Sequence, residues 1–139
     1  MKIKAAIGHL VSWVKTSELF LNPEKLLPGK WLLYEYYTEP GKELIHLERN
    51  QLSEKNLTWT IEFSPDRTFT YAANLPVALV KGVKSGNWQR DRNFLTLKNS
   101  SDPADQAEFQ FAIEKENLKL LKKDSLGKIE VFGFFRKVG

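Results

Sequence analysis

From Gly29 onward, apolar and polar residues alternate along the chain in short runs. The segment Leu57–Ser64, for example, sets Trp59, Ile61 and Phe63 on one side and threonine and glutamate on the other. A period of two is typical of β-strands that bury one face. We predict eight strands of this kind: Gly29–Thr38, Leu57–Ser64, Thr68–Ala73, Gly82–Arg90, Phe94–Lys98, Ala107–Glu114, Leu118–Lys122 and Lys128–Lys137.

The order of these strands predicts an all-β fold. No long helical segment separates them, which excludes parallel strands joined by crossover helices. Eight antiparallel strands in sequence order close readily into an up-and-down barrel, because closure removes the exposed edges of an open sheet. Within the fourth strand, Gly86 indicates a bend or a bulge.

The connections differ in length in a regular way. In a meander, alternate connections lie at the same end, so one end should carry tight turns and the other longer loops. The barrel should therefore resemble a cup. The tight hairpins are Ser64–Arg67, Arg90–Asn93 and Glu114–Asn117, and the longer connections are Glu39–Asn56, Asn74–Lys81, Asn99–Gln106 and Lys123–Gly127.

The first part of the chain follows a different pattern. Ile3, Ile7, Leu10, Val11 and Val14 share one face of a helix. We expect residues 1–26 to form an amphipathic N-terminal helix and linker on the closed end of a barrel domain spanning residues 27–139. Binding of the same helix to a membrane surface or to a partner is the alternative.

Composition narrows the function classes. A chain of 139 residues suits one domain, and it has no cysteine and two histidines. Disulfide scaffolds, thiol nucleophiles and cysteine-ligated metals are excluded. No serine–histidine–aspartate set, phosphate loop or metal spacing is present either, so we expect no enzyme, no metal and no cofactor.

Charge and hydropathy argue against nucleic-acid binding, a membrane span and secretion. The net charge of +4 arises in the second half of the chain, where basic residues alternate with apolar ones as on a solvated strand face. We therefore expect no nucleic-acid partner. The sequence contains no run of about 18 apolar residues, so we predict no membrane span. The polar residues His9, Ser12 and Lys15 interrupt the first apolar stretch, so we expect no secretory signal and a cytoplasmic protein, with export left open for a trimmed chain.

Several short motifs carry a family resemblance. The first strand opens with Leu27-Pro28-Gly29-Lys30-Trp31, a Gly-x-Trp motif, and FSPDRTFTY, SGNWQRDRNFLTL and KIEVFGFFRK follow in order. Together they resemble the lipocalin-like domains of the calycin superfamily that are common in Bacteroidetes. The resemblance implies that Trp31, after Gly29, plugs the closed end and that Arg136 packs across it. It also implies that Glu39–Asn56 covers the mouth, whereas Arg67 stands where those domains usually have glycine.

The resemblance and the cup shape imply a bound molecule. We expect a small-molecule binding protein, a carrier or a sensor, that holds an apolar or amphipathic ligand or lipid. The alternative is a non-enzymatic structural or protein-interaction domain whose barrel is filled by its own side chains. The candidate ligand-binding residues, in the interior and at the mouth, are Tyr37, Trp59, Ile61, Phe63, Phe69, Tyr71, Leu75, Leu79, Trp88, Phe109, Phe111 and Val131.

Two features at the expected mouth have open interpretations. The connection Asn74–Lys81 is unusually apolar, which favours a portal or lid, packing under the first connection, or a homodimer contact. The N-terminal helix is a second candidate for such a dimer contact. His46 could act as a base near the mouth, but a single histidine without a nucleophile is more typical of a structural or solvated side chain. Glu35 could face either way, since a bulge in its strand would change its side.

Overall fold

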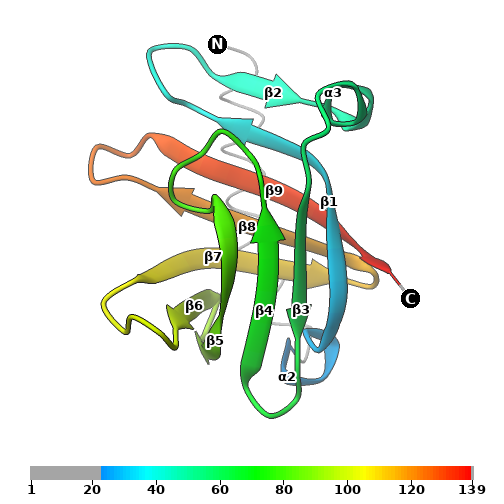
Figure 1. Cartoon of the computed structure of the whole chain (residues 1–139), viewed down its shortest axis with the longest axis vertical. Helices are drawn as coiled ribbons and strands as arrows, with labels where there is room; N and C mark the ends of the chain where they lie inside the picture. The colour runs from blue at the N-terminus through cyan, green and yellow to red at the C-terminus, as the bar shows by residue number, and fades with distance from the viewer. Residues whose placement is uncertain (1–22, 139) are drawn as a thin grey trace.

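The computed structural model describes residues 23–138, and its strands form one antiparallel sheet that closes into a barrel (Figure 1). The sheet order is β2-β1-β3-β4-β5-β6-β7-β8-β9, and pairing of β1 with β9 closes it. The all-β barrel of eight strands is therefore confirmed. Its strands are β1 (Gly29–Thr38), β3 (Trp59–Phe63), β4 (Thr68–Ala73), β5 (Gly82–Asp91), β6 (Phe94–Asn99), β7 (Gln106–Glu114), β8 (Asn117–Lys123) and β9 (Ile129–Val138).

The two ends of the barrel differ as the loop lengths predict. The three tight hairpins lie at one end of the barrel and the longer connections lie at the other, since each strand pairs antiparallel with the next. The β3–β4 hairpin is at the bottom of Figure 1. The short helix α2 (Pro23–Leu26) lies at the closed end, where the Leu27 N–H donates to the Pro23 carbonyl at 2.8 Å. The expected helix in residues 1–22 lies outside the described residues.

The first long connection contains two elements that the sequence pattern did not predict. The strand β2 (Ile45–Leu47) pairs with the last residues of β1, and the helix α3 (Arg49–Glu54) follows it. A capping box begins α3, in which the Glu48 N–H donates to Gln51 Oε1 at 2.8 Å. Elements of three and six residues are too short to show a period of their own.

A bulge in β1 changes which side chains face the interior. Leu33 pairs with Phe135 and Glu35 pairs with Phe134, so Tyr34 is the extra residue. Beyond it, Tyr36 is buried in the interior cluster and the alternation places Glu35 and Tyr37 on the outer face. The prediction that Tyr37 lines the barrel is therefore wrong, because the bulge reverses the alternation.

Gly86 does not form a bulge, which was one of the two predicted possibilities. The register of β5 against β4 runs without a shift across this residue, so no bulge forms there. A Cβ at Gly86 would instead lie 1.8 Å from the Lys98 carbonyl oxygen. The glycine is needed because the backbone of β6 approaches β5 too closely for any side chain.

Buried residues form two clusters. The larger fills the barrel, and the smaller lies on the outer face, where Leu121, Ile129, Phe132 and Phe134 gather with Tyr34 and Tyr37 at their edge. Within residues 23–138, no helix has the length and apolar character needed to cross a membrane.

Candidate functional site at the open end of the barrel

The closed end is built around Trp31, which is 0% exposed and whose Nε1 donates to the Leu27 carbonyl at 2.9 Å. The cation over its ring is Lys137, whose Nζ lies 5.4 Å from the ring centroid. Arg136, the expected partner, is exposed on the outer face, so the assignment was wrong by one residue along an alternating strand. Gly29 has a φ of +137°, and an added Cβ would lie 2.6 Å from Lys137 Cε.

A second tryptophan is held at the same end. Trp88 donates from Nε1 to the Ser64 carbonyl at 3.1 Å, and the Arg67 guanidinium lies 4.6 Å from its ring. Arg67 adopts a left-handed φ of 74°, a conformation in which glycine is the usual residue. Contacts with Trp88 and with Glu24, at 2.7 Å, offset that strain. Glu24 also pairs with Arg90 at 2.9 Å, so α2 is tied to the closed end.

The open end is built around Trp59. Its ring packs edge-on against Tyr71 and Phe135, with centroids 5.9 and 4.9 Å away. Its Nε1 and the Tyr36 hydroxyl are buried and find no hydrogen-bond partner among the described residues. Buried polar atoms are almost always paired, so two unpaired donors in one barrel call for an explanation.

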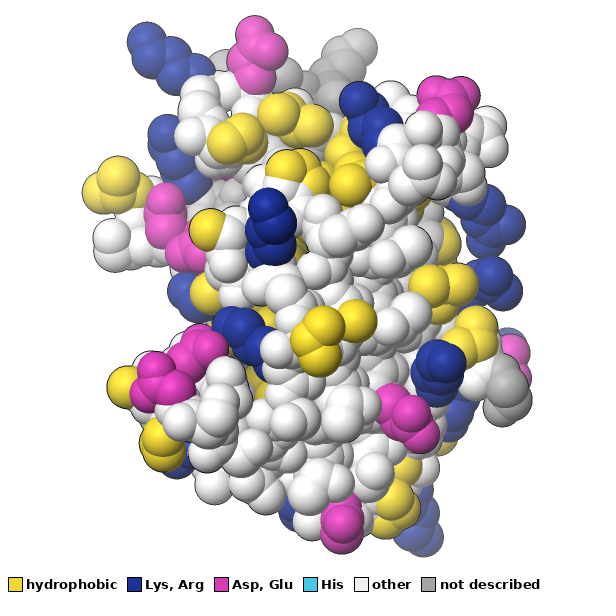
Figure 2. All heavy atoms as spheres, in the orientation of Figure 1, with side chains coloured by type: hydrophobic (Ala, Val, Ile, Leu, Met, Phe, Trp, Pro, Cys, Tyr) yellow, Lys and Arg dark blue, Asp and Glu magenta, His cyan; other side chains and the backbone are white. Residues whose placement is uncertain are grey.

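The connection between β4 and β5 covers this end. Leu75, Val77 and Val80 are buried in the interior cluster, which also contains Leu52 from α3. Asn74 fixes the start of the connection, since its Oδ1 accepts from the Thr58 N–H at 2.7 Å and its Nδ2 donates to the Asn56 carbonyl at 2.8 Å. The apolar residues of this predicted loop therefore act as a plug. Figure 2 shows hydrophobic side chains gathered at the upper end of the molecule.

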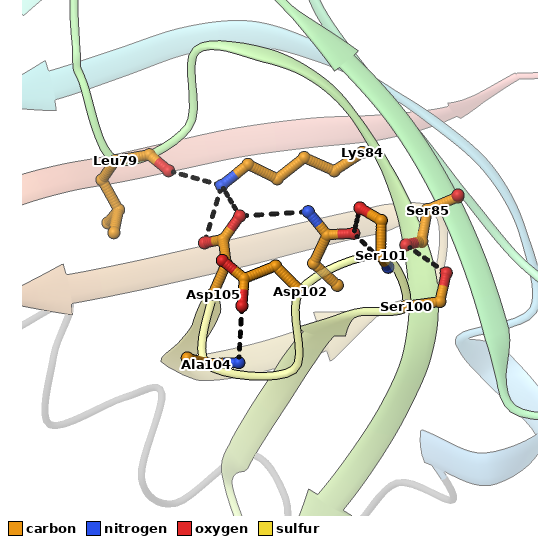
Figure 3. A network of polar contacts seen from close by, with 9 residues as sticks. Leu79, Lys84, Ser85, Ser100, Ser101, Asp102, Ala104 and Asp105 are labelled. Carbon is orange, nitrogen blue, oxygen red and sulfur yellow. Dashed lines mark hydrogen bonds and ion pairs between the residues drawn. The ribbon is translucent and has the colours of Figure 1, made fainter.

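A polar network holds the far end of the plug (Figure 3). Lys84 Nζ lies 3.1 Å from Asp105 and 3.5 Å from the Leu79 carbonyl, and Asn99 Nδ2 donates to Asp105 at 3.1 Å. Hydrogen bonds from Asn99 and then from Lys84 hold the pKa of Asp105 below its usual value. Burial, and next the charge of Asp105, raise the pKa of Tyr71, which keeps its hydroxyl protonated.

Little space remains beneath this network. The enclosed space beside Tyr71, Lys84, Asp105 and Phe109 has a volume of about 10 Å³. That volume suits one water molecule at most. The interior beside this network is therefore closely filled with the plug in place.

Most of the predicted site residues come together in the interior cluster, although a shared location does not test ligand binding. Leu79 is only partly buried against that cluster, and Tyr37 lies outside it. Sequence reasoning missed Tyr36, because its side depends on the bulge. The predicted residues found in the cluster are Trp59, Ile61, Phe63, Phe69, Tyr71, Leu75, Trp88, Phe109, Phe111 and Val131.

His46 lies in β2 on the outer face, opposite Tyr37 of β1. Its Nε2 is 2.7 Å from Glu35 Oε2, and its ring stacks on Tyr37 with centroids 4.1 Å apart. These contacts hold β2 against β1. Across residues 23–138, no three histidine, aspartate or glutamate side chains gather in a way that could hold a metal ion.

Comparisons with known proteins identify the architecture. No family model and no curated protein matches the sequence. Among solved structures, the chain is similar to a lipocalin-like protein from Bacteroides uniformis ATCC 8492, with a TM-score of 0.50 and 16% identity over 81% of this chain and 98% of that one. With the closed eight-stranded barrel, this similarity shows that the chain has the lipocalin-like fold.

Proposed function

We propose that this protein binds a small, mainly apolar molecule that carries a hydrogen-bond acceptor, in the open half of its barrel and without chemical conversion. The observation that supports the proposal most is the pair of buried donors without partners, Tyr36 Oη and Trp59 Nε1. An unpaired buried donor costs about 1–3 kcal/mol, and a ligand carbonyl, ether or hydroxyl oxygen would recover that cost.

Binding requires the plug to move. The enclosed space of about 10 Å³ is far below the roughly 300 Å³ of small-molecule sites. Withdrawal of Leu75, Val77 and Val80 would vacate the volume of three apolar side chains in the interior cluster that contains Trp59. The start of the segment is fixed by short hydrogen bonds of Asn74, whereas at its far end the contact of Lys84 with the Leu79 carbonyl is long at 3.5 Å. The proposed ligand therefore takes the place of the plug.

A second candidate function rests on the same small volume. With the plug in place, the barrel is filled by its own side chains, as in a non-enzymatic interaction or structural domain. In that case the unpaired donors would bind an ordered water molecule, and no apolar ligand would enter.

Titration of the full chain with Nile red, a neutral apolar dye that carries a carbonyl group, separates the two candidates. Binding in the micromolar range, and displacement of the dye by decanol, is expected for a ligand-binding barrel. Tyr36→Phe removes one donor and should weaken dye binding roughly twofold to tenfold. Tyr37→Phe is the matched control, because it removes the same atom from the outer face and should leave the affinity unchanged.

Two results would contradict ligand binding inside the barrel. Absence of dye and decanol binding, with the protein folded, would favour the filled domain. Equal weakening by Tyr36→Phe and Tyr37→Phe would show that the dye does not meet the interior donor.

A further inference from the structure

A groove runs along the outer wall of the barrel between β1 and α3. Pairing of β1 with β3 ends at Leu32 and Thr60, whereas β1 continues to Thr38, so the two strands separate. Figure 1 shows α3 above the start of β3 and the upper part of β1, where β1 bends. The groove between them has a volume of about 490 Å³. This volume falls within the range of about 300–1,000 Å³ typical of small-molecule sites.

The floor of the groove is apolar. Leu33 and Leu52, each 5% exposed, belong to the interior cluster, and Leu32 and Leu57 lie beside them partly buried. Tyr34, the bulge residue of β1, adds an aromatic ring to the wall. An alkyl or aryl group could therefore contact carbon on several sides.

Two arginines line the same groove. Arg136 comes from β9 and Arg49 from the first turn of α3, with its guanidinium 5.9 Å from the Tyr34 ring centroid. Among the residues that the structure describes, no carboxylate lies within 4.0 Å of either guanidinium, and no acidic side chain lines the groove. Arg67 and Arg90 at the closed end, by contrast, share Glu24.

We propose that this groove binds a small amphipathic carboxylate. The apolar part lies on the four leucines, and the carboxylate accepts hydrogen bonds from Arg49 and Arg136. The planar guanidinium matches a carboxylate with two parallel bonds, and such charge-assisted bonds are about twice as strong as neutral ones. The site lies on the outer wall, so it does not require the plug to move and is independent of binding inside the barrel.

Titration of the ¹⁵N-labelled full chain with decanoate, and with decanol as the neutral analogue, tests the proposal by NMR. Decanoate should shift the amides of Leu32, Leu52 and Leu57 and bind at least tenfold more tightly there than decanol. Arg49→Gln and Arg136→Gln should each weaken decanoate binding about tenfold and leave decanol binding unchanged. Arg92→Gln makes the same charge change on the exposed β5–β6 hairpin and should have no effect.

Three results would overturn this assignment. One is equal decanoate affinity in the native chain and in a variant that carries both Arg49→Gln and Arg136→Gln. Another is a decanoate response confined to interior amides such as those of Trp59 and Tyr71. The third is concentration-dependent dimerisation by light scattering that Arg49→Gln abolishes, without decanoate binding, because it would assign the groove to a second copy of the chain. Binding of Nile red inside the barrel could still be observed in each case.

Discussion

The closed and open ends of the barrel are both apolar and closely packed, but they differ in whether their buried polar atoms have hydrogen-bond partners. At the closed end, the indole N–H groups of Trp31 and Trp88 donate to backbone carbonyls, and a cation lies over each ring. At the open end, the N–H of Trp59 and the hydroxyl of Tyr36 have no partner among the described residues. Burial alone thus does not distinguish a structural end from a candidate binding end, whereas hydrogen-bond satisfaction does.

The two ends also close by different means. Tight hairpins and ion pairs of Glu24 with Arg67 and Arg90 seal one of them. An inserted loop seals the other through Leu75, Val77 and Val80. Loops attached mainly by side-chain packing open at lower free energy than paired strands. The open end therefore combines unpaired donors with the cover that is easier to displace.

The largest expected effect tests the closed end. Trp31→Ala removes a fully buried indole and its bond to the Leu27 carbonyl, so the free energy of unfolding should fall by about 3–5 kcal/mol. Urea denaturation followed by circular dichroism measures it. A loss below about 1 kcal/mol would mean that Trp31 does not hold the closed end together.

A smaller effect compares the two ends directly. Trp88→Phe and Trp59→Phe remove the same atoms, but only the Trp88 N–H makes a hydrogen bond, to the Ser64 carbonyl. Trp88→Phe should therefore lower the free energy of unfolding by about 1–2 kcal/mol more than Trp59→Phe. Parallel urea titrations of both variants give this difference. Equal losses would remove the distinction between the ends.

Much of the fold follows from the sequence, because period-two alternation and loop length are local properties. They predict all eight barrel strands, the tight turns at one end with the longer connections at the other, and many of the residues in the interior cluster. The resemblance that the Gly-x-Trp motif carries implies that Trp31 lies at the closed end, and the structure buries Trp31 beside Leu27. These features do not depend on cross-strand register, since the alternation within each strand indicates which of its residues are buried.

The wrong predictions concern residues whose side of the sheet depends on the register between strands. Tyr37 and Tyr36 change sides because of a bulge that is visible only in the pairing of β1 with β9. Lys137 replaces Arg136 over Trp31 for a similar reason, since consecutive strand residues face opposite ways. The groove beside α3 exists because β1 and β3 separate beyond Leu32, and no single segment encodes that separation. Unpaired donors, likewise, are a property of the whole packed interior.

The smallest expected effect concerns the attachment of the plug. The pKa of Asp105 is lowered in the folded state, chiefly by Asn99 and then Lys84, so its stabilising contribution is present above the unfolded pKa of about 3.8. That contribution is lost as the pH falls below this value through the folded pKa. Protonation should also weaken the contact of Lys84 with Asp105 and loosen Leu79, whose carbonyl the same Nζ approaches. The amide shifts of Leu79 and Val80 should therefore titrate with Asp105 in NMR spectra between pH 5 and pH 2. They should stop doing so in Asp105→Asn, while the closed-end amide of Trp31 stays constant in both proteins. A titration of Leu79 that persists in Asp105→Asn would show that another group attaches the plug.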